Sequence, residues 1–278
     1  MRFPRVRLPI ALALVLVVVA CDQGPVEWRG GASEVALPAV AGADGVGDER
    51  TAPRDAQLVL GANGAPALES IPSVASLPND STACPGSFRT AALSSTEIYS
   101  VWWSHRASGH AVLLSARSDD SGGTWTAPVP VDTTDRGASG CGRPAASIVA
   151  DAKSGYVHVA YFLTSPGGPG VFFAHSMDRG ELYHSPVPIM YGARPSATAV
   201  AAADDVVVVA FEDPNTDRAR IALAISRTWG HIFARERPEA SAGTPLAQRP
   251  LVALRYPLVA VGWHDKARTV VARVGTLR

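Results

Sequence analysis

The feature that most constrains the fold is a unit of about 50 residues that recurs four times along the chain. Each unit begins with an arginine at the head of an apolar run: Arg89, Arg143, Arg194 and Arg249. A second apolar run in each unit ends in an aromatic residue: Trp103, Tyr161, Phe211 and Trp263. A single unit of this size cannot bury its apolar surface alone, so the repeats must pack against one another.

Short runs of β-branched and aromatic residues, separated by turn residues, predict strands within these units. The clearest runs are Val112–Ala116, Ile148–Ala150, Tyr156–Phe162, Val206–Phe211, Ile221–Ile225 and Val259–Trp263. A unit of about 50 residues with four antiparallel strands is typical of a propeller blade. We therefore expect an all-β protein, with residues 55–278 forming a β-propeller of four four-stranded blades.

The fourth unit ends after three predicted strands, which would leave one edge of its sheet unpaired. Propellers avoid such an edge by taking a strand from the other end of the chain. We expect Ala56–Leu60 to supply that strand, with Ile71–Leu77 as the alternative. A third possibility is that both segments only lie across the surface.

A turn motif stands at the same place in three units, fifteen residues after each aromatic residue. Residues 118–125 read Ser-Asp-Asp-Ser-Gly-Gly-Thr-Trp and fit S-x-D-x-G-x-T-W, so they resemble the Asp box of the sialidase (BNR) repeat family. Residues 176–183 and 226–233 match it in part, and the third replaces Asp with Thr. We expect a structural role, in which Ser and Asp cap backbone amides and Gly takes a positive φ. The residues concerned are Ser118, Asp120, Gly122, Trp125, Ser176, Asp178, Gly180, Tyr183, Ser226, Gly230 and Phe233.

The four unit-starting arginines would meet at one mouth of such a propeller, near the ends of the second strands. Those ends carry His105, Asp213, His264 and Asp265. Arginine binds carboxylates through a planar fork, so Arg89, Arg143, Arg194 and Arg249, with His105, Asp213 and Asp265, are candidate ligand-binding residues. In the alternative interpretation, the arginines pair with the neighbouring acids and simply close the channel. Trp102 either stacks on a sugar or packs between blades.

The resemblance implies an activity that the sequence matches incompletely. Sialidases hold a carboxylate with three arginines and use a tyrosine nucleophile with a glutamate and an aspartic acid. Phe88-Arg89 matches the start of their Phe/Tyr-Arg-Ile-Pro motif, but Thr90-Ala91 departs from it, and no tyrosine can be placed as nucleophile. The family's enzymes also have six blades, more than this chain can hold. We therefore expect a non-catalytic module that binds an acidic glycan, another carboxylated ligand or a protein, with a divergent exo-sialidase and a structural envelope protein as alternatives.

The first residues predict export. Arginines precede an apolar run that ends in Val-Val-Ala-Cys, which resembles a bacterial lipobox. We expect residues 1–20 to be a lipoprotein signal peptide, Cys21 to be lipidated and residues 21–54 to be a flexible tether. A plain signal peptide is the alternative. The protein would then reside in the bacterial cell envelope and touch the membrane only through its lipid. Its 25 basic and 25 acidic residues cancel, which argues against nucleic-acid binding.

The remaining cysteines and histidines complete the expectations. Cys84 and Cys141 lie just before Arg89 and Arg143, at the entrances of adjacent blades, and predict a disulfide after export. Two free buried thiols are the alternative. Zinc-binding motifs such as H-E-x-x-H and C-x-x-C are missing and the seven histidines are dispersed, so we expect neither a metal site nor a cofactor.

Overall fold

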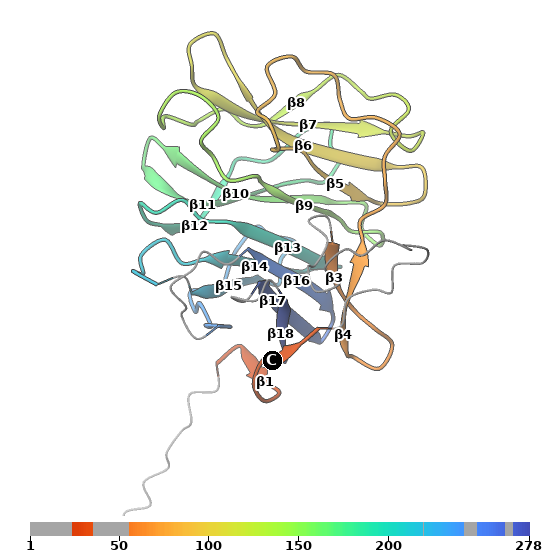
Figure 1. Cartoon of the computed structure of the whole chain (residues 1–278), viewed down its shortest axis with the longest axis vertical. Helices are drawn as coiled ribbons and strands as arrows, with labels where there is room; N and C mark the ends of the chain where they lie inside the picture. Colours follow the sequence, from red (N-terminus) through yellow and green to blue (C-terminus); the bar gives the residue numbers. More distant parts are fainter. Residues whose placement is uncertain (1–23, 36–55, 219, 242–248, 265–268) are drawn as a thin grey trace, which may run out of the picture.

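The computed structural model describes residues 24–35, 56–218, 220–241, 249–264 and 269–278. These residues are all-β, as expected, and form antiparallel sheets (Figure 1). In this part of the chain, no helix is long and apolar enough to span a membrane. Residues 1–20 and Cys21 lie outside the described residues.

Four of the sheets follow the four sequence repeats. The first consists of β5 (Arg89–Ala92), β6 (Ile98–His105), β7 (Ala111–Ser118) and β8 (Val129–Asp132). The second consists of β9 (Ser147–Ala150), β10 (Val157–Ser165), β11 (Gly168–Ser176) and β12 (Val187–Tyr191). The third consists of β13 (Thr198–Ala203), β14 (Val206–Glu212) and β15 (Ile221–Ser226). The fourth contains β16 (Pro250–Arg255), β17 (Leu258–His264) and β18 (Val270–Leu277). Each is a meander, the arrangement of a propeller blade.

Most residues of the second strand of each sheet are buried. β14 is packed on both faces, against the second sheet and against the fourth. All seven residues of β14 are buried, including the run of four valines that begins at Val206. The third sheet has three named strands instead of four. Its outer edge is still bonded, since Leu223 N donates to Pro238 O (3.0 Å) and Ala240 N donates to Ile221 O (2.8 Å).

The first strands of successive sheets lie side by side in the order β5, β9, β13, β16 (Figure 1). On its other side, β16 contacts a small fifth sheet, the hairpin of β3 (Ala56–Leu60) and β4 (Pro66–Ser70). Leu58 and Leu68 of this hairpin pack with Ala253 and Ala260. The sheets therefore form an arc, and the expected closed ring of four blades is not observed.

An N-terminal strand completes the last sheet, but it is neither of the two segments expected. β1 (Val26–Trp28) pairs with β18, with Val26 opposite Leu277, and β2 (Ser33–Glu34) pairs with the same strand. The assignment of Ala56–Leu60 to this position was wrong, because that segment pairs with β4. The expected tether is also wrong for residues 26–28 and 33–34, which lie in strands.

Candidate functional site: the central cavity

The first strands of the sheets enclose a cavity of about 1210 Å³. β3, β5, β9, β13 and β16 all contribute to its wall. Their lining residues are mostly small or aliphatic, such as Thr90 and Ala91 on β5 and Thr198, Ala199 and Ala201 on β13. Short side chains on the innermost strands leave the centre of the arc hollow.

The charged residues of the cavity are of one sign. Arg89, Arg143, Arg249 and Arg255 line it, together with His264. Among the described residues, no Asp, Glu or Tyr contributes to the lining. The cavity therefore presents a positive wall to any ligand that enters it.

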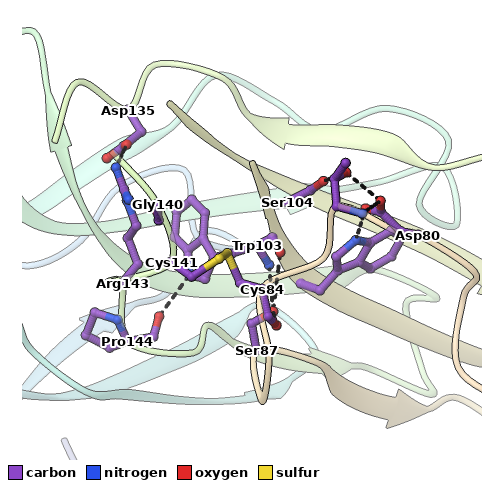
Figure 2. Close-up of a disulfide and its surroundings, with 12 residues drawn as sticks. Asp80, Cys84, Ser87, Trp103, Ser104, Asp135, Gly140, Cys141, Arg143 and Pro144 are labelled. Carbon is purple, nitrogen blue, oxygen red and sulfur yellow. Dashed lines mark hydrogen bonds and ion pairs between the residues drawn. A yellow bond between two sulfur atoms is a disulfide. The ribbon is translucent and has the colours of Figure 1, made fainter. Parts of the chain in front are cut away.

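Three of the four predicted arginines line this cavity at the starts of its inner strands. The Nη1 atom of Arg89 donates to the carbonyl oxygens of Gly86 (3.0 Å) and Phe88 (2.6 Å). Arg143 is almost fully buried and forms an ion pair with Asp135 (Figure 2). Arg249 is exposed. The guanidinium of Arg143 is thus already engaged by a carboxylate, as the channel-closing interpretation expected, although the partner is none of the acids considered there.

Arg194 does not join the other three. It is not part of the cavity lining, and its Nη2 atom donates to the backbone carbonyl of Asp213 (2.8 Å). The Asp213 carboxylate accepts a hydrogen bond from Asn215 N (2.9 Å) and also lies outside the lining. His105 is exposed at the end of β6, away from the lining residues. Asp265 falls outside the described residues.

Trp102 packs inside the protein and cannot stack on a sugar. It is fully buried and lies parallel to the Phe88 ring, with 5.2 Å between ring centroids. Its indole nitrogen donates to Asp80 Oδ2 (2.8 Å). Burial acts to raise the pKa of Asp80, but hydrogen bonds from Thr82 and Trp102 outweigh it and bring that pKa to about 2. An aspartate held in this way fixes the entrance to the first sheet.

The expected disulfide between Cys84 and Cys141 is confirmed (Figure 2). Beside it, Cys84 N donates to Trp103 O (2.7 Å) and the Trp103 indole donates to Pro144 O (2.8 Å). The first bond ties Cys84 to β6 of its own sheet, whereas the indole bond and the disulfide reach the segment around Arg143 that leads into the second sheet. The disulfide therefore links two segments whose neighbouring residues, Gly86 and Arg143, line the cavity.

The three segments that match the turn motif adopt one geometry. The glycine at the fifth position donates its N–H to the serine hydroxyl at the first position, at 2.8, 2.8 and 3.0 Å for Gly122, Gly180 and Gly230. The third position of each accepts a hydrogen bond from the backbone four residues later, from Thr124, Leu182 and Ile232. Because Thr228 accepts this bond as Asp120 and Asp178 do, the third turn keeps its shape without an aspartate.

The last residue of each motif reaches toward the preceding part of the fold. The Tyr183 hydroxyl donates to Ser115 Oγ of the first sheet (3.0 Å), and Phe233 meets Phe173 of the second sheet edge-on, with 5.0 Å between centroids. The indole of Trp125 donates to Ser76 O (3.1 Å). Tyr183 and Phe233 thus join neighbouring sheets, Trp125 holds the segment that precedes the first sheet, and all three lie outside the cavity lining.

One group of residues was not predicted. His175, His184 and His231 lie together, although the histidines are dispersed in the sequence. Alignment of the repeats is the sequence signal that could have indicated this group, because residues 184 and 231 lie in or directly after the turn motifs of adjacent units.

Comparison with known proteins gives no family. No family model and no curated protein matches the chain. Similar solved structures include the Hadza microbial sialidase Hz136, with 14% identity and a TM-score of 0.48 over 65% of this chain and 42% of that one. They also include the NanB sialidase from Streptococcus pneumoniae, with 14% identity and a TM-score of 0.43 over 76% of this chain and 33% of that one. A thermostable family-43 glycoside hydrolase has 14% identity and a TM-score of 0.38 over 67% and 68% of the two chains.

This chain thus spans less than half the length of either sialidase. Similarity at this level carries no argument about activity, which has to be drawn from the cavity.

Proposed function

We propose that this chain is a non-catalytic binding module whose central cavity holds an acidic glycan or another carboxylated ligand. The observation that carries the proposal is the charge of the lining, which among the described residues contains four arginines and no carboxylate. A concave surface of this charge favours a ligand that brings its own negative charge.

The arginines are not equivalent in this role. Arg143 is committed to Asp135, and Arg255 donates to Ala62 O (3.0 Å) at the far end of β16. Arg249 is exposed at the start of the same strand, and Arg89 is fixed by two carbonyl oxygens at the start of β5. A guanidinium can bind both oxygens of a carboxylate. Arg89 and Arg249 are therefore the residues that would contact the ligand.

Binding is favoured over hydrolysis by what the described lining offers. Glycoside hydrolysis generally requires two carboxyl groups, or in sialidases a tyrosine with its acidic neighbours. Neither arrangement is found among the described lining residues. Arginines alone can orient an anionic sugar but supply no acid, base or nucleophile.

We further propose that the protein is exported to the bacterial cell envelope and anchored through a lipid on Cys21. The Cys84–Cys141 disulfide supports this location, because disulfides persist in oxidising compartments. Mass spectrometry of the N-terminal peptide tests the anchor: a diacylated Cys21 at the new N-terminus supports it, and an unmodified residue excludes it.

Binding can be tested by titrating sialic acid and uronic-acid oligosaccharides into the protein by isothermal calorimetry, with neutral sugars of equal length as comparison. We expect binding of the acidic sugars alone, and at least a tenfold loss in Arg89→Ala and Arg249→Ala. Arg235→Ala is the matched control, because Arg235 is exposed and lies outside the cavity lining. Equal affinities in all three variants would exclude the cavity as the site.

A fluorogenic sialoside assay separates binding from catalysis. We expect no turnover. Turnover that is lost in Arg89→Ala and retained in Arg235→Ala would replace the binding module by a hydrolase.

A further inference from the structure

The strongest unassigned feature is the cluster of His175, His184 and His231, which we call the histidine cluster. One ring nitrogen of each lies within 4.8 Å of the corresponding nitrogens of the other two. The His175 ring lies 4.6 Å from that of His184 and 4.5 Å from that of His231, between centroids.

His175 is the buried member of the cluster, with 2% of its surface exposed. Its Nε2 atom is buried and has no hydrogen-bond partner among the described residues. Burial, followed by the neighbouring His231 and His184, lowers the pKa of His175 to about 4. An unpaired polar atom at a buried position calls for a partner that the described chain does not supply.

Two turns bring the exposed rings to His175. His184 follows the second turn motif, and its backbone N–H donates to His175 O (2.9 Å). His231 lies inside the third turn motif, where its N–H donates to Thr228 O (3.0 Å). Both turns are fixed by the serine and glycine bonds described above. The three histidines thus come from the second and third repeats, and hydrogen bonds within the two turns hold the backbone of His184 and His231 in place.

We propose that the histidine cluster binds a Zn²⁺ ion through one ring nitrogen of each of the three histidines. Neutral imidazoles are the preferred nitrogen ligands of zinc, and three protein ligands leave a fourth position for water or for a side chain of another molecule. Zinc–nitrogen bonds of about 2.0–2.1 Å place tetrahedral ligands roughly 3.4 Å apart. The three nitrogens lie within 4.8 Å of one another, so binding requires the exposed His184 and His231 rings to move closer to His175.

The zinc site is independent of the central cavity. His175 is paired with His158 near the start of β10, whereas Asp135, the partner of Arg143, accepts a hydrogen bond from Thr164 N near the end of that strand. None of the three histidines lines the cavity. Failure of ligand binding in the cavity would therefore leave the zinc site untouched, and the reverse also holds.

The two exposed ligands allow a test that does not disturb the core. The full chain carries Cys21→Ser in every sample, so that this thiol adds no ligand, and is titrated with ZnCl₂ against a chromogenic zinc chelator. We expect one equivalent of zinc to bind, with affinity reduced at least tenfold in His184→Ala and in His231→Ala. His110→Ala is the control, because His110 is exposed in the turn between β6 and β7 and is not part of the cluster. MgCl₂, which prefers oxygen ligands, should not compete.

Cobalt gives a second measurement. Co²⁺ bound by three imidazoles and a water should produce visible absorption that disappears in His184→Ala and persists in His110→Ala. Absence of saturable zinc binding, or equal affinity in the three histidine variants, would overturn the proposal.

Discussion

At the residue scale, the motif glycines of the three turns combine positive φ with, in one case, very close packing. Gly122, Gly180 and Gly230 have φ of 87°, 81° and 89°, as a motif glycine should. Gly230 has a further constraint, since a Cβ atom placed there would lie 2.2 Å from Cε1 of Phe173. The close approach of Gly230 to Phe173 lies between the third repeat and the second sheet. The motif sequence alone does not predict it.

Replacing Gly230 with alanine should therefore lower the free energy of unfolding by about 2 to 4 kcal/mol, through positive φ and overpacking together. Chemical denaturation followed by tryptophan fluorescence measures this change. Gly142→Ala is the control, because that glycine has no positive φ and open space around it. Equal effects of the two substitutions would contradict the packing described for Gly230.

Asp80 gives the protein a specific sensitivity to acid. Its pKa is about 2 in the folded protein and near 3.8 without the fold. Because the folded pKa is the lower one, the carboxylate stabilises the fold above pH 3.8, and this contribution is lost as the pH falls through 2. In Asp80→Asn the free energy of unfolding should fall less steeply between pH 4 and pH 2 than in the wild type. Parallel curves from denaturant titrations at each pH would disprove this.

Side-chain direction is what the sequence could not supply at this scale. Arg194 begins its repeat as Arg143 does, yet it bonds to the backbone at Asp213 while Arg143 lines the cavity. Trp102 and Trp103 alternate along one strand, yet both are buried. Trp103 meets Tyr161 of the second sheet. Trp102, in contrast, is covered by Phe88 and Asp80 of the segment that precedes β5. Repeat position predicts where a backbone runs, and local neighbours decide where a long side chain points.

At the element scale, the repeat predicted the strands well because each sheet is built from residues close in sequence. The six clearest apolar runs all lie in or across strands of the four repeat sheets. β1 was not predicted, because it has only three residues, lies in a glycine-rich region and pairs with a strand at the opposite end of the chain. Local pattern carries no information about so distant a pairing.

The contribution of β1 can be measured with Val26→Asp. Val26 is 8% exposed and packs in the cluster that contains Leu277. Loss of its apolar contacts and burial of a carboxyl group should reduce the free energy of unfolding by about 2 to 4 kcal/mol. Glu34→Gln, at an exposed position of β2, should change it by less than about 0.5 kcal/mol. If Val26→Asp behaves like this control, residues 26–28 do not form part of the last sheet.

At the scale of the whole molecule, stacking of four similar sheets produces a cavity that no single repeat contains. Its positive wall could be anticipated from the arginine at each repeat start, whereas its open arc could not, because the β3–β4 hairpin has no counterpart in the repeats. The histidine cluster is likewise a property of adjacent units rather than of one.

The disulfide should stabilise this assembly by restricting the unfolded chain. It links residues 57 apart, for which the loop-entropy model gives about 4 kcal/mol, with smaller values common in practice. The double variant Cys84→Ala, Cys141→Ala should lose about 2 to 4 kcal/mol of unfolding free energy. Adding a reductant should destabilise the wild type and leave the variant unchanged. A wild type that is insensitive to the reductant under unfolding conditions would contradict this role.

The pairing of Val26 with Leu277 also governs the order in which the protein can fold. The first three repeat sheets can assemble as soon as their own residues are available, because their strands are neighbours in sequence. The fourth sheet needs strands from both ends of the chain. Its β1–β18 pairing joins residues far apart in the sequence, so we expect this pairing to form last. The edge of β18 that pairs with β1 would therefore be the last sheet edge to be covered during folding.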